Sequence, residues 1–402
     1  MKLLLLATGA MTLQQVFSTI SANALSVIAP AVAAGLGVSP ALIGPFSAIV
    51  YGTSMLGGLS CGSAIRRHGG LRMSQVGLLM CASGLMLAGL GILPLLTIAA
   101  ALVGVQYGIG TPASSQILTR YAPPRLAPLI FSVKQTGVPL GHALAGFMLP
   151  FLVAQIDWRG ALFVTGILCV AVMVGLEPLR AEFDKHREGR AAPPFSLGAI
   201  FANLRELMAQ RALRDLAWCA MAYVGIQTSF VTFFVTYLVD GLAITLQDAG
   251  GIFAISLAIA AGARIFWGWL SGITSARPVL AVIGFGAVAS AVAVGLYDRD
   301  WSHLAIAIAA TGTTVTAVGW HGVVLAEIAR LSPPEKVAPR TGGLLGFGSI
   351  AQVTFPMIVS GLYGLTGDYG TGFFVIAIPS LIATINILRP LPRDLAPPNP
   401  PA

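Results

Sequence analysis

The side chains with the clearest chemical potential in this sequence are ionisable groups inside long apolar stretches. Lys134 lies about a turn and a half inside one such stretch, beside Gln135 and Thr136. An ionisable group at membrane depth is costly and is a hypothesis for a functional site by default. Lys134 could be the counter-ion of an anionic substrate, or it could extend to the membrane surface or pair with a carboxylate.

Two histidines occupy comparable positions. His142 lies two turns beyond Lys134 in the same stretch, and His321 follows Trp320 in another. Histidine titrates near neutral pH, so either ring could carry a proton. Hydrogen-bonded packing is the simpler interpretation of each ring.

Glu327 is the best placed carboxylate for proton coupling, because it lies near the end of an apolar stretch, two turns before a polar loop. Its alternative role is an ion pair with Arg264 or Arg330. We therefore predict Glu327, His142 and His321 as candidate proton carriers.

Hydroxyl, amide and aromatic side chains recur at helical spacing in four of the apolar stretches. Such a stripe either lines a polar path or joins helices to one another in lipid. The stripes comprise Gln14, Ser18 and Ser21; Tyr107, Thr111 and Ser114; Tyr223 and Gln227; and Thr313, Thr316 and Trp320, and a further stretch adds Gln352.

The composition excludes a soluble protein. Of the 402 residues 56% are hydrophobic and only 9% are charged, whereas soluble domains carry about 25% charged residues. Mean hydropathy is +0.84, and the shortage of charge also excludes a disordered chain. We expect an integral membrane protein.

No motif indicates an enzyme. A nucleophile elbow, a zinc-binding helix and a phosphate-binding loop are all missing from the sequence, and each would be needed for its chemistry. We expect no cofactor and no metal. The four cysteines lie in apolar stretches without metal-binding spacing, which favours small buried side chains: Cys61, Cys81, Cys169 and Cys219.

A membrane helix needs about 20 mostly apolar residues, and none of the stretches alternates in polarity as barrel strands do. Twelve stretches meet this requirement, so we predict an all-α membrane protein with twelve transmembrane helices. They are residues 8–33, 41–65, 73–92, 95–119, 129–154, 160–178, 214–239, 248–272, 278–297, 303–329, 341–365 and 370–388.

The basic residues predict the orientation. With both termini in the cytoplasm, 19 of the 23 Lys and Arg lie in inward-facing segments, and only Arg159 and Arg299 lie in outward loops. This positive-inside bias accounts for the net charge of +8 without a nucleic-acid partner. Lys2 and the following leucines imitate a signal peptide, but its cleavage would leave an odd number of spans.

A polar segment divides the chain into halves of six spans. Leu36-Gly-Val-Ser39 with Gly44 recurs 206 residues later as Leu242-Ala-Ile-Thr245 with Gly250. We therefore predict two repeated bundles, a transporter architecture with its substrate site between the halves. The predicted parts are a first bundle over 1–178, a cytoplasmic linker over 179–213 with an amphipathic helix, a second bundle over 214–388 and a Pro-rich tail over 389–402.

The chain resembles the major facilitator superfamily over nearly its whole length. The resemblance rests on Leu36 to Gly44, on the short basic loop from Gly62 to Arg72, and on Arg264-Ile-Phe-Trp-Gly268. Two departures are evident. The aspartate that the family pattern places four residues after each loop glycine is here Arg66 and Gly272, and the usual span-four arginine is here Gly104.

The resemblance implies that spans one, four, seven and ten line a central cavity. On that basis the candidate substrate-binding residues are Gln14, Ser18, Tyr107, Thr111, Lys134, Gln135, Tyr223, Gln227, Trp320, His321 and Gln352. It also implies gating at the cytoplasmic ends, for which the candidates are Arg264, Arg66 and Arg67.

We expect a monomeric secondary transporter of the bacterial inner membrane that moves a small organic anion, such as a carboxylate, with protons and in contact with lipid. The cavity candidates include a lysine and two histidines but no central carboxylate, which favours an anion. One alternative is export of hydrophobic compounds, which Gly137-Val-Pro139-Leu-Gly141 weakly supports. Another is a receptor of the same fold that does not transport.

Overall fold

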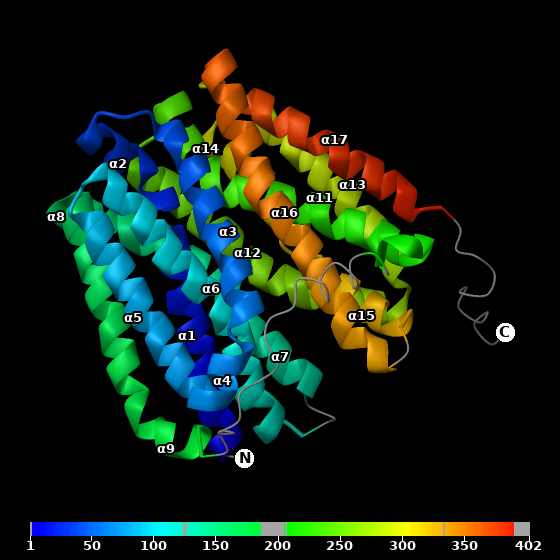
Figure 1. Cartoon of the computed structure of the whole chain (residues 1–402). Coiled ribbons are helices and arrows are strands. Elements are labelled where there is room, and N and C mark those ends of the chain that lie inside the picture. Colours follow the sequence, from blue (N-terminus) through cyan, green and yellow to red (C-terminus); the bar gives the residue numbers. More distant parts are fainter. Residues whose placement is uncertain (1, 124–126, 186–204, 206, 333, 390–402) are drawn as a thin grey trace.

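The structure, a computed structural model, consists of long helices packed side by side (Figure 1). It describes residues 2–123, 127–185, 205, 207–332 and 334–389. Every regular element in these residues is a helix, which confirms the predicted fold class.

The described residues of the first half contain five long helices, of which α8 is bent, joined by short ones. Its elements are α1 (Lys2–Val27), α2 (Ala29–Leu36), η1 (Pro40–Leu42), α3 (Ile43–Ser60), α4 (Gly62–His68), α5 (Gly70–Gly89), α6 (Leu93–Tyr121), α7 (Ala127–Gln135), α8 (Gly137–Gly175), η2 (Glu177–Leu179) and α9 (Arg180–Phe183).

The second half follows the linker and has a similar succession of elements. It contains α11 (Arg211–Thr236), η3 (Tyr237–Gly241), α12 (Leu246–Ile273), α13 (Ala276–Gly295), α14 (His303–Ala317), α15 (His321–Arg330), α16 (Pro334–Thr366) and α17 (Tyr369–Ile387).

Eleven helical ranges in the described part of the chain are long and apolar enough to cross a membrane. One of them, residues 133–183, is 51 residues long and is bent at Ile156 and Asp157, whose backbone angles are not helical. Asp157 has a φ of 66° and a ψ of 176°, a combination that residues other than glycine rarely adopt. Counting the two sides of this bend separately gives twelve segments, the number that the sequence predicts.

Two of the predicted spans contain a break in the helix. The span 129–154 is interrupted at Thr136, between α7 and α8. The span 303–329 is interrupted at residues 318–320, between α14 and α15. Both interruptions lie beside the candidate site described below.

The helices form two groups, which appear in Figure 1 as the blue-to-green and the green-to-red parts of the chain. In the first group α3 and α5 pack on α6, and α1 and α5 pack on α8. In the second, α11 packs on α16, α13 on α17 and α12 on α14. The two groups meet chiefly where α8 packs on α12 and where α3 packs on α16.

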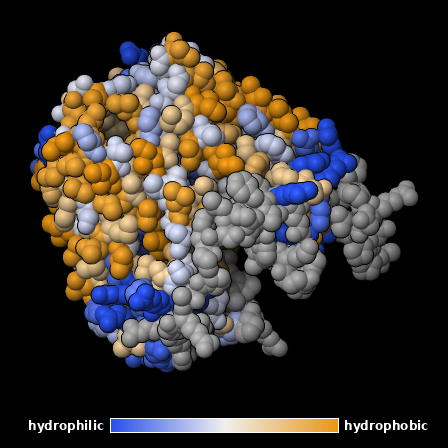
Figure 2. All heavy atoms as spheres, in the orientation of Figure 1, coloured by the Kyte–Doolittle hydropathy of each residue, from blue (hydrophilic) through white to orange (hydrophobic). Residues whose placement is uncertain are grey.

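The surface is that of a membrane protein. Large apolar side chains are exposed along the helices, such as Phe147 at 69% and Leu304 at 71%. Figure 2 shows apolar residues over most of this face, with hydrophilic residues gathered around α4 and α9 and near the end of α17. Several helices begin or end on one side of the molecule with arginines, namely Arg66, Arg67, Arg72, Arg120 and Arg277. We call this side the basic side and the opposite side the far side.

The contact between the two groups depends on glycines. Gly250 of α12 lies so close to Gly146 of α8 that a Cβ on Gly250 would collide with the Gly146 carbonyl and lie 2.5 Å from Pro150 Cγ. A Cβ on Gly44 would lie 2.6 Å from Ser360 Cβ of α16. Small residues thus let the helices of the two halves approach closely.

We expect Gly250→Val to separate the halves on the far side, because its side chain has no room against α8. Spin labels at Leu42 and Leu365, which are 48% and 85% exposed, should then give longer distances in a background without native cysteines. Gly251→Val is the matched control, since nothing lies within 4 Å of a Cβ on Gly251. Equal distances in both variants would contradict the proposal that the close α8–α12 contact holds the two halves together.

Asp184 caps the start of α5 on the basic side of the first half. Its Oδ1 accepts a hydrogen bond of 2.9 Å from the N–H of Leu71, and its Oδ2 accepts one of 2.9 Å from the N–H of Arg72. These N–H groups begin α5, where a carboxylate is favourable. The start of the linker is therefore attached to the loop after span two. The amphipathic helix predicted within the linker lies largely outside the described residues.

Asp184→Ala should destabilise the protein by about 1–2 kcal/mol, the usual effect of removing such a cap. Asp184→Asn keeps one acceptor oxygen and should have a smaller effect. Thermal unfolding of the purified protein in detergent measures both. An Ala variant as stable as the wild type would show that the cap contributes nothing.

Candidate functional site

Arg264 of α12 joins the two halves of the molecule. Its Nε donates a hydrogen bond of 3.0 Å to the carbonyl oxygen of Val318, in its own half. Its Nη1 donates one of 3.3 Å to the carbonyl oxygen of Gln135, in the other half. The side chain is half-buried, and two of its five N–H donors are thereby used.

Both acceptors lie where a helix is interrupted. Gln135 is the last residue of α7, and Val318 follows the last residue of α14. The carbonyl end of a helix carries partial negative charge and favours a cation. The two interruptions thus stabilise a guanidinium in the middle of the spans without a carboxylate.

Side chains of α12 also account for the interruption in span ten. In a continuous helix the Val315 carbonyl would accept from Gly319 and the Val318 carbonyl from Gly322. Instead Trp267 Nε1 donates to the Val315 carbonyl at 2.8 Å, and Arg264 takes the Val318 carbonyl. Side chains that insert into the helical ladder are a known cause of such breaks.

Three further predicted residues lie in the wider neighbourhood of Arg264. Tyr107, His142 and His321 are each close enough to interact electrostatically with its guanidinium. His142 also makes a 3.0 Å hydrogen bond with the Val138 carbonyl through Nδ1. The structure therefore brings together residues from spans four, five, eight and ten.

Lys134 is a second buried cation, next in the chain to Gln135, whose carbonyl oxygen accepts from Arg264. Its side chain is 1% exposed, and its Nζ donates a hydrogen bond of 2.7 Å to Gln15 Oε1 of α1. Gln15 Nε2 in turn donates to Thr19 Oγ1 at 3.4 Å. A glutamine oxygen is a weak partner for a buried ammonium, which normally requires a paired charge.

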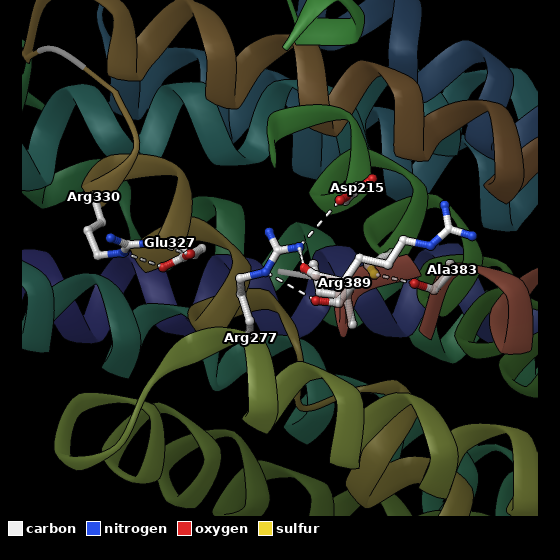
Figure 3. A network of polar contacts seen from close by, with 8 residues as sticks. Asp215, Arg277, Glu327, Arg330, Ala383 and Arg389 are labelled. Atoms are coloured by element: carbon white, nitrogen blue, oxygen red, sulfur yellow. Dashed lines mark hydrogen bonds and ion pairs between the residues drawn. The ribbon is translucent and has the colours of Figure 1, made fainter. Parts of the chain in front are cut away.

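The buried carboxylates of the described residues are used elsewhere. Asp184 caps α5, as described above. Asp215 lies 3.3 Å from Arg277. Glu327, which is 3% exposed, accepts two hydrogen bonds of 2.7 Å from Arg330 (Figure 3). None of the described ion pairs involves Lys134 or Arg264.

The Glu327 pair is the alternative role that the sequence left open. The carboxylate is occupied by a neighbour three residues away on the same helix. We therefore omit Glu327 from the proton carriers proposed below.

Amides in the first half are buried without partners. Both polar atoms of the Gln14 amide, and Gln106 Nε2, have no hydrogen-bond partner among the described residues. Ser18 donates a hydrogen bond of 2.9 Å to Gln106 Oε1. The sequence did not single out Gln15 and Gln106, although each directly adjoins a predicted residue, Gln14 and Tyr107 respectively.

Comparison with known proteins decides the family. The family model described as Major Facilitator Superfamily matches residues 11–327. The chain belongs to the major facilitator superfamily. It is accordingly a transporter rather than an enzyme, as the sequence predicts.

Relatives within the superfamily include carriers of organic acids. The chain is 24% identical to the gallate transporter of Pseudomonas putida, over 90% of this chain and 86% of the relative. It is 23% identical to the 4-hydroxybenzoate transporter PcaK of the same organism, over 91% of this chain and 87% of the relative. It is 21% identical to the probable galactarate/D-glucarate transporter GudP of Escherichia coli, over 75% of this chain and 72% of the relative.

Solved structures agree with the superfamily fold. A POT family transporter in complex with 5-aminolevulinic acid has a TM-score of 0.77, with 13% identity over 95% of this chain and 94% of that one. A bacterial homolog of the lysosomal transporter Spinster, inward-facing and unoccupied, has a TM-score of 0.74, with 16% identity over 96% of each chain.

Some predicted residues of this superfamily member have no described hydrogen bond to Arg264 or Lys134. The Tyr223 hydroxyl donates to the Leu280 carbonyl at 3.0 Å and lies 3.1 Å from Thr384 Oγ1. Tyr223 is therefore engaged in packing within the second half. Thr111 is exposed, and Gln227 and Gln352 are half-buried; we include none of these four in the proposed site.

The predicted gating arginines of the short basic loop lie apart from the site. Arg66 and Arg67 are in the last turn of α4 on the basic side, and Arg67 is exposed. Neither forms an ion pair with a described carboxylate. Their gating role remains a prediction.

The glycines of span five serve helix packing. A Cβ on Gly141 would lie 2.6 Å from Thr19 Cβ, and one on Gly137 would lie 3.0 Å from the Thr12 carbonyl oxygen. Both contacts are to α1. The stretch that weakly supported export therefore has a structural explanation in close helix approach. Gly104, at the position of the missing arginine, likewise packs on Val50 of α3.

Proposed function

We propose that this superfamily member transports an organic anion, and more specifically an aromatic carboxylate. The observation that carries the proposal is a pair of intramembrane cations, Arg264 and Lys134, that have no carboxylate partner among the described residues. The names of the gallate and 4-hydroxybenzoate transporters support the same substrate class.

The physical basis is charge compensation. Burying a cation without a counter-charge is unfavourable, and an incoming carboxylate supplies that counter-charge. Arg264 keeps three N–H donors for a planar carboxylate, a geometry that guanidinium groups recognise well. Lys134 adds positive potential from the first half.

Arg264 also offers a connection between binding and movement. Its bond to the Gln135 carbonyl crosses the interface between the halves. A carboxylate bound to the guanidinium competes for the same N–H donors and weakens the hydrogen bond to the Gln135 carbonyl. Substrate binding then shifts the balance between the two arrangements of the halves, as a ligand with different affinities for them must.

We further propose proton-linked uptake across the bacterial inner membrane, with the basic side in the cytoplasm. A negative interior opposes anion entry unless cations accompany the anion. The candidate carriers are His142, His321 and Lys134, because the buried carboxylates among the described residues already have partners.

Transport into proteoliposomes tests this function. We expect labelled 4-hydroxybenzoate or gallate to accumulate under an inward proton gradient, and the neutral analogue 4-hydroxybenzamide not to. Protein-free liposomes provide the control. Accumulation of tetraphenylphosphonium without carboxylate flux would favour export of hydrophobic compounds, and binding without any flux would favour a receptor.

A further inference from the structure

The start of α15 has unused hydrogen-bond donors. Its first described backbone bond joins the N–H of Val324 to the carbonyl of Trp320. The N–H groups of His321, Gly322 and Val323 therefore have no backbone acceptor among the described residues. For Gly322 the cause is visible, since Arg264 occupies the Val318 carbonyl that it would otherwise use.

The interruption of span ten thus separates two opposite helix ends. The carbonyl end of α14 carries partial negative charge and is bound by the Arg264 cation. The N-terminal end of α15 carries partial positive charge and is suited to an anion. Discontinuous helices place such ends beside substrates and ions in other transporters.

A second feature at this helix start also indicates a ligand. Trp320 immediately precedes α15 and is 2% exposed, and its Nε1–H has no acceptor among the described residues. Buried Trp N–H groups normally have a partner. The indole lies against the first residue of the helix, with its ring centroid 3.8 Å from that of His321 and the planes 22° apart.

The start of α15 is also accessible. Gly322 is exposed, and nothing lies within 4 Å of a Cβ built on it. His321 is half-buried. A small ligand can therefore approach the free N–H groups from the side on which Gly322 is open.

We propose that the N-terminus of α15 is the carboxylate-binding subsite of this transporter. The substrate carboxylate accepts hydrogen bonds from the N–H groups of residues 321–323 and faces Arg264 across the interruption. This inference rests on the proposed function and makes it more specific, since it assigns the carboxylate to the backbone of α15.

The stacked rings next to the subsite indicate the rest of the substrate. His321 stacks on the buried Trp320 ring and is itself half-buried, so His321 presents a flat ring surface beside the subsite. A planar ring attached to the carboxylate would stack on such a surface. The subsite therefore favours aryl carboxylates over sugar acids, and 4-hydroxybenzoate should bind more tightly than glucarate.

Gly322→Pro tests the backbone directly, because proline removes one N–H and is tolerated in the first turn of a helix. We expect its affinity for 4-hydroxybenzoate, measured by equilibrium binding to purified protein, to fall about tenfold. Gly322→Ala also adds a Cβ but keeps the N–H, so we expect it to bind more tightly than the Pro variant, and the ratio of the two affinities reports the N–H alone. Equal affinities in the Pro and Ala variants would overturn the subsite.

Trp320→Phe provides an independent arm, because it keeps a ring and removes the Nε1–H. We expect a fall of about threefold or more in affinity, and an unchanged affinity would count against the subsite. If the Gly322→Pro variant does not yield monodisperse protein, the Trp320→Phe variant alone tests the subsite. If the wild type binds no carboxylate, the proposed function itself fails. If the wild type binds but neither variant differs, only the subsite fails.

Discussion

Arg264→Gln should lower the affinity for 4-hydroxybenzoate about a hundredfold and reduce its uptake to near background. Removing one member of a desolvated, hydrogen-bonded charge pair costs about 2–5 kcal/mol, and each 1.4 kcal/mol is a factor of ten. Glutamine can still donate to the Val318 carbonyl, so the fold should persist. Binding and uptake by purified, reconstituted protein measure the effect.

Two controls make the Arg264 prediction specific. Arg299→Gln makes the same change at an exposed arginine on the far side and should transport normally. Arg264→Lys keeps the charge without the planar fork and should restore part of the affinity. A Gln variant that binds like the wild type would remove the main support for an anion site.

Lys134→Met should reduce uptake at least tenfold while leaving the protein as stable as the wild type, or more so. Methionine fills a similar volume and removes a buried charge, and such replacements are often neutral or stabilising. A lysine needed only for structure would behave differently, because its loss would lower stability and leave uptake by the folded fraction unchanged. The thermal midpoint and uptake per folded protein separate the two cases.

The control for Lys134 is Lys185→Met, at an exposed lysine that pairs with Glu182. A surface pair contributes little, so neither uptake nor stability should change. Normal uptake by the Lys134 variant would leave Arg264 as the sole counter-ion of the substrate. It would contradict the two-cation account.

Sequence predicts the membrane layout well because that layout depends on local composition. Apolar length and loop charge predict the number of spans. The described residues contain eleven membrane-spanning ranges, or twelve if the two sides of the bend at Asp157 are counted separately. The i, i+3 spacing of Glu327 and Arg330 already made their ion pair one of the open alternatives. Such features need no knowledge of tertiary contacts.

The site is less predictable because it depends on contacts between distant helices. Span ten contains no proline near its interruption. The break arises because Trp267 and Arg264, from another helix, take its carbonyl groups. For the same reason the sequence assigned Arg264 to a gate alone, whereas its guanidinium bonds across the interface of the halves and lies within electrostatic range of Tyr107 and His321.

The most direct test of the central claim is substrate exchange in proteoliposomes without any ion gradient, because exchange requires the binding site but no coupling. Liposomes loaded with unlabelled 4-hydroxybenzoate should take up the labelled compound when they contain wild-type protein, and should not when they contain Arg264→Gln. Exchange of equal rate in the two proteins, or no carboxylate exchange in the wild type, would contradict the account.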